Sequence, residues 1–181
     1  MDFKVTLQKI LTEFDQKGVR YALMGGFALG VLGIPRTTVD LDFLVNRDDA
    51  THIAQIMQQI GYECAYQSEN VAQYISALKI FGEVDFLYAF RSSALAMLNR
   101  AVEKELSGKT IKVLRVEDII GLKLQAAVNN SARFSQDWAD IEALADCYKA
   151  ELDWELIEGY FSLFERQDLF QSLKRKALET K

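Results

Sequence analysis

The stretch Tyr21–Val45, YALMGGFALGVLGIPRTTVDLDFLV, contains the features from which we predict both the fold and the function. Its apolar first residues predict a strand, which stops at two adjacent glycines, Gly25 and Gly26. Adjacent glycines allow a sharp turn and let a ligand approach the bare main chain. A short helix beginning at Phe27 would aim its free N–H groups back at this turn, where an anion such as a phosphate could bind.

Two carboxylates occupy the second half of the stretch. Asp40 and Asp42 alternate with apolar residues between Val39 and Val45, which predicts a strand that carries both carboxylates on one face, about 7 Å apart. Two like charges on a largely buried strand repel each other and lose solvation, so a positive group is expected beside them. Mg²⁺ meets this requirement, because it binds one or two carboxylates and completes its shell with water and substrate phosphates.

The same stretch resembles the signature of the polymerase-beta-like nucleotidyltransferase superfamily. The glycine pair is followed after thirteen residues by Asp-Leu-Asp, and Arg36-Thr37-Thr38 stands shortly before it. The variant Arg-x-Thr-x-Asp-Leu-Asp is most similar to the minimal nucleotidyltransferases of the AbiEii-type abortive-infection toxins. The resemblance implies an α+β fold, in which a nucleotidyltransferase-type mixed β-sheet is flanked by helices and followed by a helical C-terminal part.

The resemblance also implies a role for each polar residue of the stretch. Main-chain N–H groups of the two glycines would contact the phosphates of a bound NTP, and Arg36 and Thr38 would bind the same nucleotide. Asp40 and Asp42 would hold one or two Mg²⁺ ions. From the residues alone, Arg36 could also pair with one of these two carboxylates, and that role is compatible with phosphate binding.

A third carboxylate stands in a later predicted strand. In the run Glu83–Tyr88, Glu83 and Asp85 share one face and apolar residues share the other. In the superfamily that the sequence resembles, a carboxylate on a later strand completes the metal site, and Asp85 falls at that place. The strand taken by itself favours a different interpretation, the polar face of an edge strand.

Composition and charge restrict the function further. Half of the 181 residues are hydrophobic, which is typical of a folded domain with a real core, and no apolar run is long enough to cross a bilayer. We therefore expect a cytoplasmic protein without a membrane partner. The formal charge of −5 argues against a wholly basic nucleic-acid binder. A single histidine, His52, and two cysteines without metal spacing, Cys64 and Cys147, argue against Ser-His hydrolase and zinc chemistry.

Hydrophobic periodicity predicts the remaining elements. Helices are predicted at 3–15, at 48–60 with Asp48 as N-cap and at 92–104 with Ser92 as N-cap, and strands at 19–24, 62–66, 71–81 and 108–116. From Glu117 onward the apolar spacing is helical. We therefore expect residues 1–116 to form a nucleotidyltransferase α/β core, and residues 117–181 to form a helical part packed on this core as one compact unit.

The helical part contains a second similarity to the AbiEii type. That group carries a lysine on one helix and Asp-x-x-Asp on the next, close to the nucleotide, and Lys123, Asp137 and Asp140 stand at these places. The resemblance implies that Lys123 takes part in catalysis by reaching triphosphate oxygens and that Asp140 helps to bind the nucleotide, with Asp137 as the weaker candidate. A partly buried salt bridge between two packed helices would explain the same three residues without a ligand.

Together these features imply transfer of a nucleoside monophosphate from an NTP to an acceptor hydroxyl, with release of pyrophosphate. Asp85 would bind the metal nearest that hydroxyl and could take its proton. An RNA acceptor, in particular a tRNA end, in a toxin-like role with an antitoxin protein as a candidate partner is favoured over a small molecule such as an aminoglycoside. A nucleotide-binding regulatory protein without turnover is a third alternative.

Overall fold

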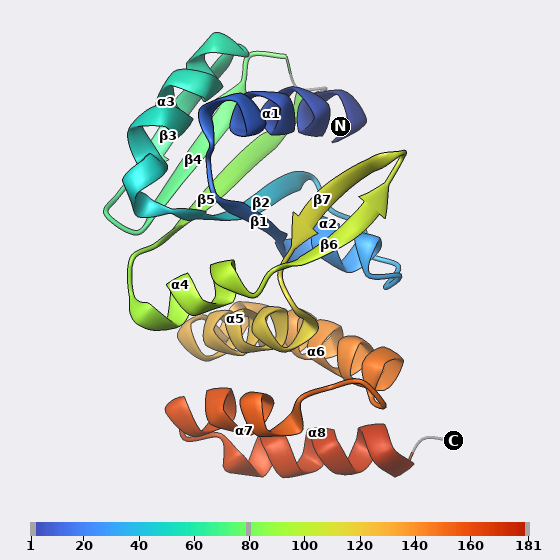
Figure 1. Cartoon of the computed structure of the whole chain (residues 1–181). Coiled ribbons are helices and arrows are strands. Elements are labelled where there is room, and N and C mark those ends of the chain that lie inside the picture. The colour runs from blue at the N-terminus through green and yellow to red at the C-terminus, as the bar shows by residue number, and fades with distance from the viewer. Residues whose placement is uncertain (1–2, 79–80, 180–181) are drawn as a thin grey trace. The chain divides into compact units, whose positions relative to one another are not determined.

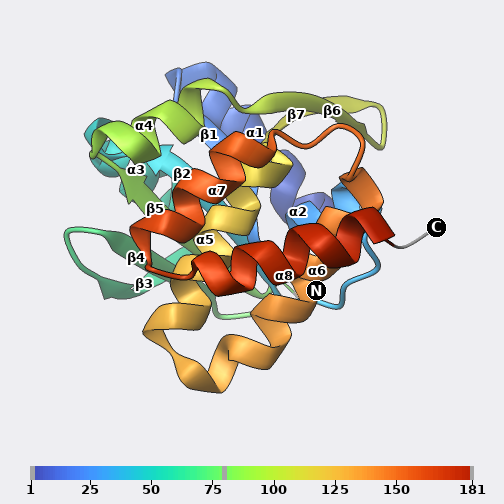
Figure 2. The same ribbon diagram turned by 90° about the horizontal axis from the view of Figure 1, so that it is seen from below.

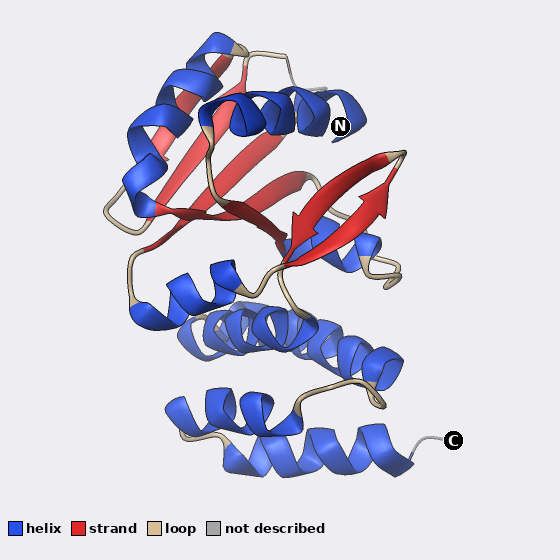
Figure 3. Ribbon diagram, in the orientation of Figure 1, coloured by secondary structure: helices blue, strands red, loops and turns tan. Residues whose placement is uncertain are grey.

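The protein is described here from a computed structural model, in residues 3–78 and 81–179. The chain forms two compact units, the first ending at Leu114 and the second beginning at Arg115. The first unit contains a β-sheet with helices, and the described residues of the second are helical apart from turns (Figure 3). No helix among the described residues has the length and apolar character needed to cross a membrane. The predicted boundary after residue 116 and the packing of the helical part on the core remain predictions.

A single mixed sheet forms the centre of the first unit. In spatial order its strands are β3 (Tyr62–Gln67), β4 (Val71–Ser76), β5 (Glu83–Ala89), β2 (Asp40–Asn46), β1 (Tyr21–Met24), β7 (Lys109–Val113) and β6 (Val102–Leu106). β2 is parallel to β5 and antiparallel to β1, while β7 is parallel to β1. The mixed sheet flanked by helices that the sequence predicts is thereby confirmed.

One face of this sheet is covered by α1 (Phe3–Lys17) and α3 (Ala50–Gln59), which lie side by side (Figure 1). The period-2 alternation of β2 and β5 turns large apolar residues to this face. Phe14 of α1 lies 5.4 to 6.2 Å, between ring centroids, from Tyr21, Phe43 and Phe86. Aromatic pairs of this kind contribute about 0.5–1.5 kcal/mol each beyond the area they bury. The opposite face of β2 and β5 carries the carboxylates, and we call it the carboxylate face.

Two shorter helices flank the strands that carry the carboxylates. α2 (Gly25–Val31) directly follows β1 and packs on β1 and β2, and α4 (Ser92–Asn99) packs on β2 and β5. α2 begins at the glycine pair itself, whereas the sequence predicted a helix from Phe27. The glycines therefore directly follow the last strand residue, Met24, and begin the first turn of the helix.

The second unit consists of two layers of helices. α5 (Val116–Asn129) packs with α6 (Phe134–Tyr148), and α7 (Trp154–Leu163) packs with α8 (Gln167–Glu179), with a short 3₁₀ turn, η3 (Ser131–Arg133), between α5 and α6 (Figures 1 and 2). Gly121 allows close packing of the layers, since a Cβ there would lie 2.8 Å from ring atoms of Tyr160. The Tyr160 hydroxyl donates to Asp118 Oδ1 at 2.6 Å, which satisfies both buried polar groups.

Both predicted N-caps are wrong. Asp48 lies inside the 3₁₀ turn η1 (Arg47–Asp49), where its backbone N–H donates to Asn46 Oδ1 at 3.1 Å, and α3 begins at Ala50. Ser92 is the first residue of α4, and Arg91 is its N-cap. Asn46, two residues before Asp48, provides the capping oxygen for η1, and Asp48 is therefore part of the turn.

The predicted helix at 92–104 and the predicted strand at 71–81 are both too long. The helix predicted at 92–104 ends at Asn99, and Val102–Leu106 instead pair as β6 with β7. The hairpin turn is Ser107-Gly108, with φ of 52° and 77°, and positive φ at both central residues is what a two-residue hairpin loop requires. The strand predicted at 71–81 ends at Ser76, and its residues 79 and 80 lie outside the described residues.

Candidate active site

Asp40, Asp42 and Asp85 lie together on the carboxylate face. Parallel pairing of β2 with β5 places Asp42 opposite Asp85. Asp40 lies two residues before Asp42 in β2 and therefore points to the same face. One carboxylate oxygen from each residue lies within 4.8 Å of the other two, and all three residues are partly buried. We call these residues the carboxylate triad. The structure thus brings together the three metal ligands predicted from distant parts of the sequence.

Asp85 is the most perturbed member of the triad. Its Oδ1 atom is buried and accepts no hydrogen bond from the described residues. Burial, followed by the negative charges of Asp40 and Glu83, raises the pKa of Asp85 from 3.8 to about 6, although a hydrogen bond with the Gln73 side chain lowers it. A buried acceptor without a donor costs about 1–3 kcal/mol. Three oxygen donors, one of them unsatisfied, fit a hard divalent cation such as Mg²⁺.

Gly25 makes room for the triad. It has φ of +68°, which favours glycine, and a Cβ on it would lie 1.9 Å from Asp42 Oδ2 and 2.8 Å from Asp42 Cβ. Met24, just before it, pairs with Asp42 across β1 and β2. Any side chain at position 25 would therefore displace the Asp42 carboxylate. The predicted contact of Gly25 with phosphates stays a prediction, but the structure gives a second reason for glycine at this position.

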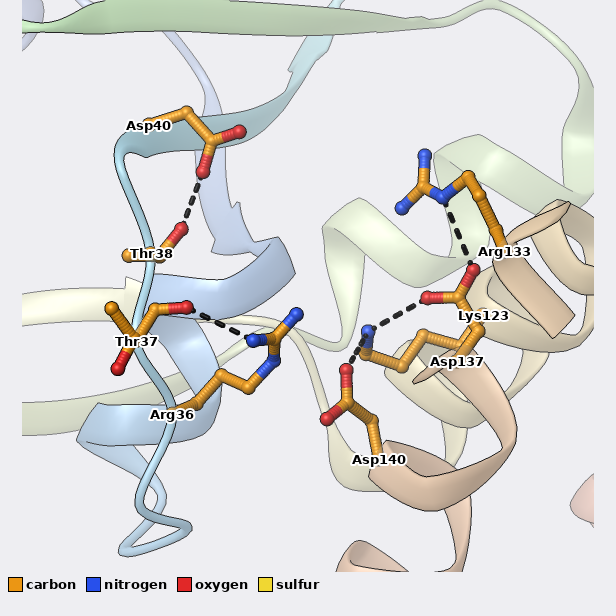
Figure 4. Close-up of polar contacts among 8 residues, drawn as sticks. All are labelled: Arg36, Thr37, Thr38, Asp40, Lys123, Arg133, Asp137 and Asp140. Atoms are coloured by element: carbon orange, nitrogen blue, oxygen red, sulfur yellow. Dashed lines mark hydrogen bonds and ion pairs between the residues drawn. The ribbon is translucent and has the colours of Figure 1, made fainter. Parts of the chain in front are cut away.

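Thr38 connects the glycine pair to the triad. Its Oγ1 donates a hydrogen bond to Asp40 Oδ1 (Figure 4). A Cβ on Gly26 would lie 2.7 Å from the same Oγ1, so the bare main chain at Gly26 leaves the space that Thr38 occupies. Thr38 therefore orients the Asp40 carboxylate, a role that the sequence did not indicate. The nucleotide contact predicted for Thr38 remains a prediction.

Arg36 precedes this group in the same loop. Its Nη1 donates to the Thr37 carbonyl oxygen at 3.0 Å (Figure 4). This bond ties the guanidinium to its own loop. The predicted roles of Arg36 toward phosphates and toward the carboxylates both stay predictions.

A pocket of about 300 Å³ opens beside the triad on the sheet. Asp42 and Asp85 line it together with residues of β1, β3, β4 and β5, and most of the lining is apolar; the other members are Met24, Phe43, Tyr66, Val71, Ala72, Gln73, Phe86 and Leu87. Sequence reasoning missed Gln73 and Tyr66. Gln73 could have been found, because it alternates with apolar residues in β4 as Asp85 does in β5.

The second unit contains a separate ionic cluster. Lys123 Nζ, on a side chain that is 11% exposed, donates to Asp137 Oδ1 at 3.1 Å and to Asp140 Oδ2 at 2.6 Å (Figure 4). Arg133 Nε lies 3.3 Å from Asp137 Oδ2, yet this oxygen accepts no hydrogen bond within the described residues. The predicted ion pair between packed helices is thus present. The predicted contacts of Lys123 and Asp140 with a nucleotide stay predictions.

The single histidine and the two cysteines, for which the sequence predicts no catalytic role, belong to neither the carboxylate triad nor the ionic cluster. His52 is exposed in α3, and Cys64 and Cys147 are exposed free thiols. None of the three lines the pocket beside the triad.

The chain matches the family described as nucleotidyl transferase AbiEii toxin, Type IV TA system, over residues 9–181. The protein belongs to the AbiEii family. This match confirms the family resemblance and the enzyme class, a nucleotidyltransferase, that the glycine pair and Asp-Leu-Asp predict. The description also places the family among toxin–antitoxin systems.

Solved structures share the fold of this AbiEii-family chain. The solution structure of the antibiotic-resistance factor ANT(2″)-Ia is 16% identical, covers 95% of this chain and 97% of its own, and has a TM-score of 0.69. The crystal structure of ANT(2″)-Ia with adenylyl-2″-tobramycin is 15% identical, with 88% and 97% covered and a TM-score of 0.70. The lincosamide antibiotic adenylyltransferase LnuA, with bound lincomycin, is 18% identical, with 78% and 96% covered and a TM-score of 0.59. No curated protein sequence matches the chain.

Proposed function

We propose that this protein transfers a nucleoside monophosphate from an NTP to a hydroxyl group of an RNA, and that it acts as the toxin of a toxin–antitoxin pair. The observation that carries the proposal is the carboxylate triad, with the glycine pair against Asp42 and Thr38. The family description supports the toxin role and an antitoxin as partner. A tRNA end is the RNA acceptor that we favour.

The transfer is a single displacement at the α-phosphorus. The oxygen of the acceptor hydroxyl forms a bond to this phosphorus, the bond from the phosphorus to the bridging oxygen of the β-phosphate breaks, and pyrophosphate leaves with the electron pair. The proton of the hydroxyl passes to Asp85 Oδ1, a buried oxygen that accepts no hydrogen bond from the described residues. The product is an RNA that carries one additional nucleotide.

The triad residues hold the metal in this scheme. Asp40, Asp42 and Asp85 would bind one or two Mg²⁺ ions, which when bound neutralise phosphate charge and lower the pKa of the attacking hydroxyl. Thr38 keeps the Asp40 carboxylate oriented through its hydrogen bond. Main-chain N–H groups at the glycine pair and the Arg36 guanidinium would contact the phosphates.

Lys123 and Asp140 belong to the proposal as nucleotide-binding residues. The Lys123 Nζ already donates to two carboxylates, so a triphosphate oxygen would have to share it or replace one of these bonds. An ammonium group has three N–H donors, which leaves one for a phosphate oxygen while both ion pairs are kept.

A small-molecule acceptor is the second candidate. The formal charge of −5 favours a cationic acceptor such as an aminoglycoside over an anionic one. One of the structures that share the fold contains adenylyl-2″-tobramycin. A protein that binds nucleotides without turnover is the third candidate, but retention of all three carboxylates argues for activity.

One experiment separates the three candidates. The protein is incubated with Mg²⁺, each labelled NTP in turn, and either total tRNA, an aminoglycoside mixture or no acceptor, with Asp42→Ala as the matched inactive variant. We expect label on tRNA and release of pyrophosphate with the wild type alone. Label on the aminoglycosides would establish the second candidate. A rise in melting temperature with NTP and Mg²⁺ but no pyrophosphate would establish the third, and neither binding nor release would overturn nucleotidyl transfer.

A further inference from the structure

A β-bulge in the edge strand β3 changes the direction of one aromatic side chain. β3 pairs antiparallel with β4, with Cys64 opposite Tyr74, but the next pair joins Tyr66 to Gln73, so Ala65 is the additional residue. In a regular register without the bulge, Ala65 would lie opposite Gln73 and Tyr66 opposite Ala72. Ala72 and Gln73 point to opposite faces of the sheet, because neighbouring residues of a strand always do. The bulge therefore turns Tyr66 to the carboxylate face, where Gln73 lies.

This redirected side chain forms a wall of the pocket beside the triad. Tyr66 and Gln73 line the pocket together with Asp42 and Asp85. Tyr66 is 57% exposed, so most of its ring surface is available to a ligand. Bulges are enriched next to active sites, where they re-aim a side chain. The pocket thus presents an exposed aromatic ring at one side and the proton-accepting oxygen of Asp85 at the other.

The chemistry of the remaining lining limits what can bind there. Met24, Val71 and Leu87 are apolar, and Gln73 offers an uncharged amide whose Nε2 also donates to Glu83 at 3.2 Å. The carboxylates of the lining, Asp42 and Asp85, both belong to the triad, so a bound metal would neutralise them. A polycation would therefore find no further carboxylate in this lining. A flat, largely apolar ring with polar edges fits better.

We propose that this pocket binds the base of the acceptor nucleoside, stacked on Tyr66, and so positions the hydroxyl of that nucleoside at Asp85. The volume of about 300 Å³ lies at the lower end of the range for small-ligand pockets and is suited to one nucleoside rather than a larger segment of RNA. Stacking on an aromatic side chain tolerates every base, so the pocket selects RNA ends over aminoglycosides without selecting one sequence. This inference rests on the proposed nucleotidyl transfer and specifies its acceptor subsite.

The test compares three variants of the full chain. Tyr66→Ala removes the ring, Tyr66→Phe keeps it, and Ile75→Ala removes another exposed apolar side chain of the same sheet face, 41% exposed, that does not line the pocket. For each we measure KM for tRNA, KM for the NTP, kcat and the melting temperature. We expect Tyr66→Ala to raise KM for tRNA by at least about 5-fold, and its KM for NTP to stay at the wild-type value. Tyr66→Phe and Ile75→Ala should leave both KM values unchanged.

The outcomes separate this inference from the function on which it rests. Equal KM values for tRNA in the wild type and Tyr66→Ala would overturn the subsite while nucleotidyl transfer stands, and so would a parallel rise in KM for the NTP. Transfer to aminoglycosides instead of RNA would also overturn the subsite without touching the transfer chemistry. Failure of the proposed function itself has a different signature, namely no pyrophosphate release by the wild type with any acceptor.

Discussion

The carboxylate triad and the ionic cluster around Lys123 differ in how the charges of their buried or partly buried carboxylates are compensated. Asp137 and Asp140 share the ammonium group of Lys123 at 3.1 and 2.6 Å. In the carboxylate triad, Asp40 accepts a hydrogen bond from Thr38, and neither Asp40 nor Asp85 forms an ion pair with the described residues. Burial, followed by the negative charges of Asp40 and Glu83, raises the pKa of Asp85.

This difference separates a group whose charges are compensated within the fold from one that is costly until a ligand binds. An internal cation compensates the desolvation of the carboxylates in the second unit. In the first unit the repulsion between Asp40 and Asp85 is retained in the folded protein, and a divalent cation would remove it. Gly25 leaves room for the Asp42 carboxylate, and Thr38 donates a hydrogen bond to Asp40. Four predictions test this contrast.

The largest expected effect is on stability, from Lys123→Met. This change keeps most of the apolar stem but leaves Asp137 and Asp140, with side chains 2% and 9% exposed, without their ammonium partner. Removing one partner of a buried ion pair typically costs about 3–5 kcal/mol. Chemical unfolding should show a free energy of unfolding lower by about this amount. As a control, Lys176→Met breaks an ion pair of a lysine that is 62% exposed and should cost less than about 1 kcal/mol.

Equal effects of the two lysine changes would break the contrast, because the cluster in the second unit would then contribute no more than a surface pair. A double variant tests whether the uncompensated carboxylates cause the loss of stability. If Lys123→Met is combined with Asp140→Asn, one uncompensated charge is removed, and part of the lost stability should return.

The next effect is on activity, from Gly25→Ala. The added Cβ would lie 1.9 Å from Asp42 Oδ2, and the backbone would keep its strained positive φ, so the carboxylate must move. A displacement of about 1 Å in a catalytic group can lower a rate about 100-fold. We expect a loss of this size in pyrophosphate release. The control is Gly30→Ala in the same helix, where a Cβ meets nothing within 4 Å and activity should be unchanged.

How far the sequence could predict this site follows from the same residues. Alternation within one strand predicted that Asp40 and Asp42 share a face, and Glu83–Ala89 was predicted as a strand almost in full. The register that places Asp42 opposite Asp85 is a tertiary pairing, and no pattern within either strand specifies it. The resemblance implied only that Asp85 joins Asp40 and Asp42 in one site, and the structure shows that the three carboxylates meet. Their roles toward a metal remain a prediction.

The helix cap near Asp48, the end of α4 and the bulge in β3 could not be predicted from local sequence signals alone. Asn46 and Asp48 are both good caps, and the sequence does not decide which of them is used. The apolar spacing after Ser92 continues past the true end of α4 at Asn99, so the hairpin of β6 and β7 was missed although Ser107-Gly108 is a turn signal. The bulge at Ala65 has no signal of its own in the sequence, because it depends on the register of β3 against β4.

A third prediction concerns pH and metal. The pKa of Asp85 is raised in the folded protein from 3.8 to about 6, so the folded state favours the protonated carboxyl. Its stabilising contribution is fully present below pH 3.8 and is lost as the pH rises through about 6. In EDTA, the melting temperature of the wild type relative to Asp85→Asn should therefore fall over this range. Millimolar Mg²⁺ at pH 7 should raise the melting temperature of the wild type and not that of Asp85→Asn. A difference that is constant with pH would mean that Asp85 is not destabilised in the folded protein.

The smallest effect is expected from Thr38→Val, which keeps the shape of the side chain and removes the hydroxyl that donates to Asp40. Loss of a hydrogen bond that orients a metal ligand commonly lowers metal affinity or activity 10- to 100-fold, and we expect about 10-fold here because Asp40 keeps its place in β2. The measurement is the Mg²⁺ concentration that gives half-maximal pyrophosphate release, with exposed Thr37→Val as control. Because the loss acts through the metal, excess Mg²⁺ should restore most of the activity of Thr38→Val, whereas it cannot restore Gly25→Ala, in which the Asp42 carboxylate itself is displaced. If excess Mg²⁺ restores neither variant or both, Thr38 does not act by orienting Asp40, and the hydrogen bond is only part of the loop that precedes β2.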